Sequence, residues 1–250
     1  LQPQSPTQRL IRRFTRHRAA MFGLFILLGV ILYIVIGSLI FTEAQANYKD
    51  TSRRLQPPAA EHPFGTDRIG RDIMARTIYG GQISLLIGFL AVIVEVSFGT
   101  AIGAIAGYYG GWIDSILMRL TEAMLSIPSL LLLLVMAKFF STKIPTIELL
   151  GRSFSGSVIV IILIIGLTSW MSLARIIRSN VLSLKETEFI LAARALGLPN
   201  WRIILNHILP NTLASIIVSL TLGVATAILS EAYVSFLGLG VQAPTASWGN

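Results

Sequence analysis

The sequence predicts an all-α integral membrane protein, because its apolar residues are concentrated in five long runs. Of its 250 residues, 54% are hydrophobic and 13% are charged, which is about half the charged share of a typical soluble domain. Each run is near or above the roughly 20 residues that a helix needs to cross a bilayer. None shows the alternation of a membrane β-strand. The runs are 21–41, 83–107, 123–140, 158–174 and 213–237.

The cysteine content and the placement of charge exclude several function classes. The chain contains no cysteine, so it has no disulfide, no thiolate metal site and no cysteine nucleophile. Its net charge of +8 would suit nucleic acid if the basic residues shared one soluble face. They flank the apolar runs instead. We therefore attribute the charge to membrane topology and to contact with lipid, and expect no nucleic-acid partner.

A basic cluster before the first apolar run predicts its orientation. Arginines occupy positions 9, 12, 13, 16 and 18, and no acidic residue precedes Glu43. Because such clusters hold the adjacent end of a first helix in the cytoplasm, we expect 1–20 to be cytoplasmic. The run 21–41 then forms the first transmembrane helix and 42–82 an extracytoplasmic loop.

A cleaved signal peptide is the alternative interpretation of this region. A basic start, an apolar stretch and Ala44-Gln45-Ala46 resemble its three parts. The apolar stretch, however, is longer than the roughly 7–15 residues of a signal peptide. The sequence therefore favours a retained membrane anchor.

Small residues recur every four positions in two of the runs, which predicts close approach of another helix. The packing partner can be in the same subunit or in another one, and lining a translocation path is the alternative role. The first stripe consists of Gly99, Gly103, Gly107 and Gly111. The second consists of Ser215, Ser219, Gly223, Ala227, Glu231 and Ser235.

Two carboxylates lie inside apolar runs, where a charge costs at least about 2.5 kcal/mol on insertion scales. Glu95 precedes Gly99 by four residues and Glu231 follows Ala227 by four, so each belongs to a small-residue face. We expect both to face the bundle interior. Each is either a structural hydrogen-bond partner, a carboxyl group that is protonated in place, or part of a transport path. Pro128 predicts a kink in the third run.

The segment 185–211 is too polar to span a membrane and predicts a hairpin of two short helices. Thr187 is a good N-cap for the first helix, and Gly197 follows it where a left-handed C-terminal cap needs glycine. Asn200 suits the N-cap of the second helix, which Pro210 should end. Small residues beside Arg194 suggest a docking face for another protein. An amphipathic helix on anionic lipid explains the pattern equally well.

Specific residues of this hairpin resemble a known motif. Ala192-Ala193, Gly197 and Leu209-Pro210 are similar to the "EAA" loop with which permease subunits of ATP-binding-cassette importers engage their ATPases. Leu191 stands where that motif has its glutamate. His207 resembles the peptide-importer subgroup.

Two further segments resemble the second permease subunit of dipeptide or oligopeptide importers. They are His62 to Phe89 and Ile228 to Asn250. The resemblance covers the chain from its basic start to Asn250 and is least specific over 42–61. It implies the type I importer fold, with the permease domain at 83–250. The family has a sixth span after the segment that ends here, so we expect a trimmed chain.

The resemblance also implies partners and site residues. They are a second homologous permease subunit, two ATPases that hold ATP and magnesium, and an extracytoplasmic binding protein, assembled at the bacterial cytoplasmic membrane. We expect no catalytic residue, metal or cofactor in this chain. The implied ATPase-coupling residues are Ala192, Ala193, Arg194, Ala195, Leu196, Gly197, His207 and Pro210. Candidates for the path or a subunit interface are Glu95, Gly99, Gly103, Gly223, Ala227, Glu231 and Ser235.

Rival functions lack their motifs. Gly80-Gly81-Gln82 resembles part of an ATPase signature, but no GxxxxGK[ST] loop occurs, and no HExxH or serine–base pair supports a hydrolase. The three histidines are far apart in the sequence. A channel or scaffold has no need of a docking hairpin. Dipeptides or oligopeptides are the favoured substrates, with nickel or another small solute as the alternative.

Overall fold

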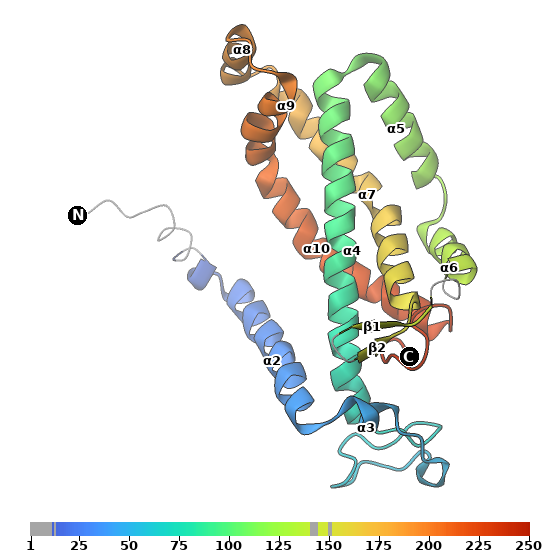
Figure 1. Cartoon of the computed structure of the whole chain (residues 1–250). Helices are drawn as coiled ribbons and strands as arrows, with labels where there is room; N and C mark the ends of the chain where they lie inside the picture. The colour runs from blue at the N-terminus through green and yellow to red at the C-terminus, as the bar shows by residue number, and fades with distance from the viewer. Residues whose placement is uncertain (1–11, 13, 141–144, 150–151) are drawn as a thin grey trace, which may run out of the picture. The chain divides into compact units, whose positions relative to one another are not determined.

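The computed structural model describes residues 12, 14–140, 145–149 and 152–250 (Figure 1). It contains two compact units, residues 1–82 and 83–250. Within the described residues, four helical segments are long and apolar enough to cross a membrane, and a bent pair provides a fifth if it forms one span. The predicted all-α membrane fold is confirmed. The four segments are α2 (Arg18–Ile40), α4 (Ile73–Tyr109), α7 (Ser157–Leu184) and Asn200–Phe236.

Unit 1 is built from α2, a short helix α3 (Glu43–Asn47) and the first turns of α4. Gly37 of α2 lies so close to α4 that an added Cβ would be 2.6 Å from Cδ1 of Ile78. The Tyr33 hydroxyl lies 2.7 Å from Oγ1 of Thr77. These contacts hold α2 against the start of α4. The arginines at positions 9 and 13, which belong to the predicted cytoplasmic anchor, lie outside the described residues.

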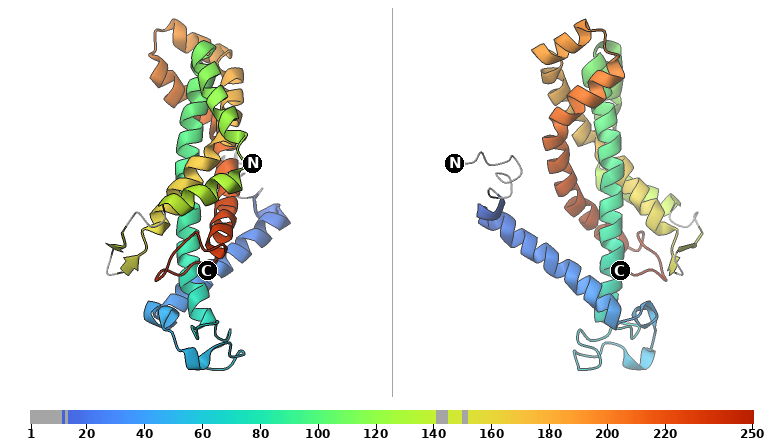
Figure 2. Two further views of the ribbon diagram at one scale, coloured as in Figure 1. Left: turned by 90° about the vertical axis from the view of Figure 1, so that its right-hand side faces the viewer. Right: turned by 60° about the vertical axis from the view of Figure 1, so that its left-hand side comes forward.

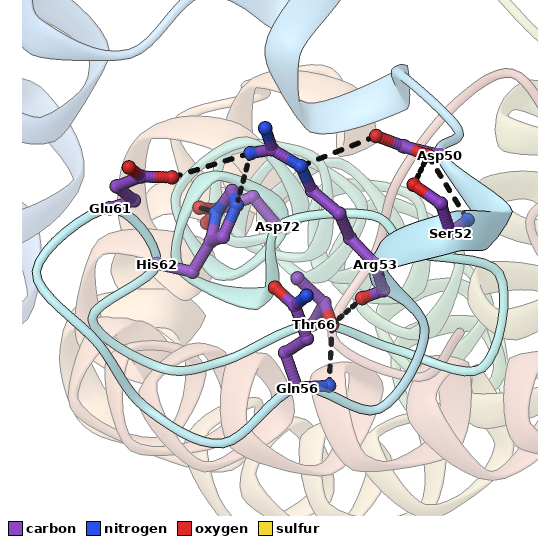
Figure 3. Close-up of polar contacts among 8 residues, drawn as sticks. All are labelled: Asp50, Ser52, Arg53, Gln56, Glu61, His62, Thr66 and Asp72. Atoms are coloured by element: carbon purple, nitrogen blue, oxygen red, sulfur yellow. Dashed lines mark hydrogen bonds and ion pairs between the residues drawn. The ribbon is translucent and has the colours of Figure 1, made fainter.

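The segment between α3 and α4 has its own polar network (Figure 3). Arg53 is the last residue of a one-turn 3₁₀ helix, Thr51–Arg53. Its guanidinium forms ion pairs with Asp50 at 3.3 Å and Glu61 at 3.4 Å. The His62 Nδ1 lies 2.7 Å from a carboxylate oxygen of Asp72. The region predicted only as a loop therefore holds its shape through side-chain pairs.

Unit 2 is assembled around α7, which is buried along most of its length. The predicted glycine stripe of α4 packs directly on it. A Cβ at Gly99 would lie 2.9 Å from the Trp170 carbonyl oxygen, and one at Gly103 would lie 2.4 Å from that of Ala174. Gly111 is not part of this surface: it follows the end of α4, has a φ of +54° and would bring a Cβ near nothing within 4 Å.

The third apolar run is not one straight helix. Helix α5 (Gly111–Leu125) begins well before the run, and α6 (Ser129–Phe140) takes the rest of it. The two helices meet at 84° across a break that contains Pro128. Proline has no N–H to continue the helical ladder and disfavours helix at the residue before it. The predicted kink is therefore a sharp bend.

Unit 2 has two distinct ends (Figures 1 and 2). At one end lie the hairpin helices α8 (Glu188–Ala195) and α9 (Asn200–Ile203), beside the turn between α4 and α5. At the other lie the carboxyl terminus and an antiparallel strand pair, β1 (Ile147–Leu149) with β2 (Arg152–Phe154).

The predicted end of the second hairpin helix is wrong. After α9 the chain makes a π-helical turn, Ile204–Ile208, and continues into α10 (Leu209–Phe236). Pro210 lies in the first turn of α10, directly after the π-helical turn, so a proline at this position does not end the helical segment. Asn200 is the first residue of α9 and Pro199 precedes it as the cap. The hairpin and the last span form one continuous structure.

Candidate functional site

The carboxylate of Glu231, on α10, is completely buried and has both oxygens hydrogen-bonded. The hydroxyl of Ser84 on α4 donates to one oxygen at 2.7 Å, and that of Ser235 donates to the other at 2.5 Å. Glu231 itself is 0% exposed. Because a buried polar group without partners is costly, these bonds are what allow a carboxyl group at this depth. We call this arrangement the Glu231 hub.

The hub also anchors the segment that follows α10. The Ser84 hydroxyl accepts from the Trp248 backbone N–H at 3.1 Å, and the Ser235 hydroxyl accepts from that of Val241 at 3.0 Å. A Cβ at Gly249 would lie 2.6 Å from Cβ of Ser235, so only glycine allows this approach. One carboxylate thus joins two membrane helices to the Gly238–Asn250 segment.

Glu95, on α4, has a different setting: it lines a cavity of about 510 Å³. The cavity lies among α4, the α5–α6 bend, α7 and α10. Gly223 of α10 is part of its wall, and a Cβ there would lie 3.3 Å from Oε2 of Glu95. Hydroxyl groups contribute much of the remaining lining, from Ser129, Thr168, Ser169, Ser172, Ser219 and Thr226. We call this space the Glu95 cavity.

The hairpin presents one buried and one exposed face. Ile190 and Ala193 of α8 and Ile203 of α9 are buried against the ends of α4 and α7. Leu196 is 80% exposed and Trp201 is 57% exposed. The predicted Ala192-Ala193 pair is therefore divided: Ala193 packs inward, and Ala192 remains on the outer surface together with Ala195.

The predicted turn between the hairpin helices is present. Gly197 has a φ of +75°, and an added Cβ would meet no atom within 4 Å. Its backbone N–H donates to the Arg194 carbonyl at 2.9 Å, and that of Leu198 to Ala193 at 3.2 Å. Glycine is needed here for the left-handed conformation and not for space.

Two family models match the chain. Residues 99–250 match "Binding-protein-dependent transport system inner membrane component", and residues 5–58 match "N-terminal TM domain of oligopeptide transport permease C". The chain belongs to this family of transport permeases. The first model covers the second part of α4 and the chain from there to residue 250, including the hairpin and Glu231, whereas Ser84 and Glu95 precede the matched residues.

Curated relatives of this permease match over nearly its whole length. It is 44% identical to a dipeptide transport system permease of Alkalihalophilus pseudofirmus, over 98% of this chain and 76% of that protein. It is 42% identical to the corresponding Bacillus subtilis permease, over 98% of this chain and 72% of that protein. An oligopeptide transport system permease of Bacillus subtilis is 38% identical, over 95% of this chain and 73% of that protein.

Tyr108, at the end of α4, connects the permease hairpin to the membrane helices. Its hydroxyl donates to Oδ1 of Asn200 on α9 at 2.9 Å. The Arg194 guanidinium of α8 lies 4.9 Å from the centroid of its ring, a cation–π arrangement. Arg194, whose cationic side chain was predicted to belong to the docking face, therefore packs on the Tyr108 ring while the residue remains exposed.

A second connection near the same end joins α5 to α7. The Arg178 guanidinium donates through Nε and Nη2 to both carboxylate oxygens of Asp114, each at 2.5 Å. A bidentate pair of this kind fixes orientation as well as distance. The pair thereby holds together α5 and α7, which both contribute to the cavity wall, and α7 leads directly into the hairpin.

Sequence reasoning missed Ser84, Tyr108 and the Asp114–Arg178 pair. Ser84 is separated from Glu231 by 147 positions, and Asp114 from Arg178 by 64. The available signal was polarity alone: a serine inside an apolar run, and two opposite charges in neighbouring membrane-edge segments. Spacing along the chain gives no partner for such residues.

Proposed function

We propose that this chain is the transmembrane permease subunit of an ATP-driven, binding-protein-dependent importer of dipeptides or oligopeptides. The support is family membership together with the printed names of relatives that match nearly the whole chain. The partners are a second homologous permease, two ATPases that bind and hydrolyse ATP, and an extracytoplasmic substrate-binding protein. The ATPases hydrolyse ATP, and this subunit moves the substrate across the membrane.

The exposed hairpin face is the observation that carries this proposal. Leu196 and Trp201 expose most of their apolar surface at the end of unit 2 where the hairpin lies. An ATPase that covers this face would bury them. The buried face is linked to α4 through Tyr108 and continues into α10 without interruption. A force on the hairpin therefore reaches two membrane helices, as a rigid-body switch between inward and outward access requires.

This assignment also sets the orientation. The hairpin meets ATPases only from the cytoplasm, and the arginines before α2 place the amino terminus on that same side. The membrane is the bacterial cytoplasmic membrane, in which lipid covers the exposed apolar faces. Nickel or another small solute remains the alternative cargo, because substrate choice in this arrangement belongs to the binding protein.

The test is Gly197→Val in the complete importer reconstituted in proteoliposomes. A β-branched residue opposes the left-handed φ and changes the angle between α8 and α9. We expect assembly to persist while peptide uptake per ATP hydrolysed falls at least several-fold. The measurements are binding-protein-stimulated ATP hydrolysis and uptake on the same vesicles.

Two controls separate coupling from general backbone strain. Gly197→Asn keeps the left-handed conformation accessible and should retain most of the coupling. Gly238→Val introduces the same strain at another open position, with φ of +77° and no atom within 4 Å of an added Cβ. Wild-type uptake and hydrolysis in Gly197→Val would contradict the coupling role.

A further inference from the structure

The Glu95 cavity contains one carboxyl group, and no cationic side chain among the described residues of its lining lies beside it. Among the described residues that line the cavity, Glu95 is the one charged side chain. Within the described part of the chain, no side chain donates a hydrogen bond to its carboxylate. Gly223 leaves room for the carboxylate in the wall of the cavity, since a Cβ added at this glycine would lie 3.3 Å from Oε2 of Glu95. An intramembrane carboxylate of this kind marks a binding function.

The neighbouring hydroxyls present acceptors to the same space. Thr168 donates its hydroxyl hydrogen to the Ile164 carbonyl at 2.7 Å, and Thr226 donates to that of Gly223 at 2.9 Å. A hydroxyl has one hydrogen and two lone pairs, so each threonine oxygen is left as an acceptor. Ser172 and Ser219 add hydroxyls from facing helices. The lining that the described residues form is rich in acceptors and contains no Lys, Arg or His.

These properties select a cation with several N–H donors. A primary ammonium has three donors and no acceptor, which matches one carboxylate surrounded by hydroxyl oxygens. A carboxylate ligand would meet repulsion from Glu95 and find no cationic partner. The volume of about 510 Å³ lies within the range of small-ligand sites. It accommodates an ammonium together with part of the molecule that carries it.

We propose that the Glu95 cavity is an intermediate binding site for the α-ammonium group of a peptide during its passage. This inference rests on the proposed import function, and it assigns to Glu95 a contact with one end of the cargo. The site offers an ammonium group one carboxylate and several hydroxyl oxygens, which are weaker acceptors. A path residue must bind well enough for entry and weakly enough for release, and this combination satisfies both needs.

The absence of cysteine in the chain allows a direct test of the charge preference. Ser219→Cys places a single thiol among these 250 residues, in the cavity wall. In the reconstituted importer, we compare its modification by aminoethyl methanethiosulfonate, a cation, and by the anionic sulfonatoethyl reagent, each normalised to a free thiol. We expect the cation to react roughly tenfold faster, since a charge-assisted contact contributes about 1.4 kcal/mol or more.

The deciding variant is Glu95→Gln, which keeps the side-chain shape and removes the charge. It should abolish the preference for the cationic reagent. Glu122→Gln is the matched control, because Glu122 lies on the neighbouring helix α5, has a side chain that is 60% exposed and does not line the cavity. It should leave the preference intact. The mass of the labelled subunit reports each modification.

A second measurement connects the charge to the cargo. Tri-alanine with a free amino terminus should slow modification of the thiol during turnover, whereas N-acetylated tri-alanine should not, and Glu95→Gln should remove the protection. Equal reaction with both reagents, no reaction with either because a neighbouring helix fills the cavity, or equal protection by both peptides would overturn the inference.

The import function is judged separately. ATP-driven uptake of tri-alanine by the importer that contains the unmodified chain tests the function, and its absence would refute peptide import. Normal uptake together with a charge preference that Glu95→Gln leaves unchanged would refute only the ammonium site.

Discussion

Glu231 and Glu95 are two carboxylates inside membrane helices, and their surroundings differ in one respect that decides their roles. Glu231 is fully buried and accepts a hydroxyl hydrogen on each oxygen. Glu95 borders a cavity and receives no hydrogen bond from the described side chains. A satisfied carboxylate stabilises the fold around it, whereas an unsatisfied one is available to a ligand. Position within an apolar run does not distinguish the two.

Removal of the Glu231 side chain should have the largest effect on stability. In Glu231→Ala the hydroxyls of Ser84 and Ser235 lose their acceptor and a buried space opens, which should lower the free energy of unfolding by about 3 kcal/mol. Thermal unfolding of the purified complex in detergent measures this change. Glu95→Ala is the matched variant and should cost less than about 1 kcal/mol, because it breaks no internal hydrogen bond. Equal losses would remove the distinction between the two carboxylates.

Ser84→Ala should have an intermediate effect on the same measurement. The Ser84 hydroxyl donates to Glu231 and accepts from the Trp248 backbone N–H, so its loss should cost about 1–2 kcal/mol. Ser97→Ala provides the control on the same helix, since that exposed hydroxyl donates only to the Ile93 carbonyl at 2.7 Å. If both variants unfold at the temperature of the parent protein, Ser84 does not support the hub.

The smallest effect concerns a satisfied carboxylate outside the membrane helices. Burial raises the pKa of Asp67, but hydrogen bonds from the backbone and side chain of Arg71 and from the Ile69 N–H outweigh it, so the pKa falls below its ordinary value of 3.8. A lowered folded-state pKa stabilises the protein above pH 3.8, and this contribution is lost as pH falls further.

Asp67→Asn should therefore lower the thermal midpoint slightly at neutral pH and by less as the pH falls below 3.8. Unfolding scans of the two proteins across that range provide the measurement. Midpoint differences that stay constant with pH would mean that the ionised form of Asp67 does not stabilise the loop.

Parts of the site could be predicted because their causes are local. The left-handed turn at Gly197 follows from the residues on either side of it, and the close packing of Gly99 and Gly103 follows from their spacing on one helix face. The bend at Pro128 has the same local origin. Its size, 84°, depends on how α5 and α6 pack and was not predictable.

Other features depend on which helices become neighbours. The inward position of Ala193, the attachment of Arg194 to the Tyr108 ring and the pairing of Glu231 with Ser84 all join distant parts of the sequence. Pro210 was expected to end a helix, yet it lies in the first turn of α10, because the hairpin continues into the last span. The residues are compatible with both arrangements, and packing selects between them.

The sequence by itself determined the membrane spans, the hairpin between the last two of them and the family to which the chain belongs. These depend on run length, residue spacing and local caps, which act over one or two helical turns. Only the tertiary structure decided that Glu231 is enclosed by hydroxyl donors and that Glu95 faces a cavity. The physical reason is that these hydrogen bonds and this cavity form between helices that are distant in the sequence. The residues on either side of each glutamate do not show which helices will become its neighbours.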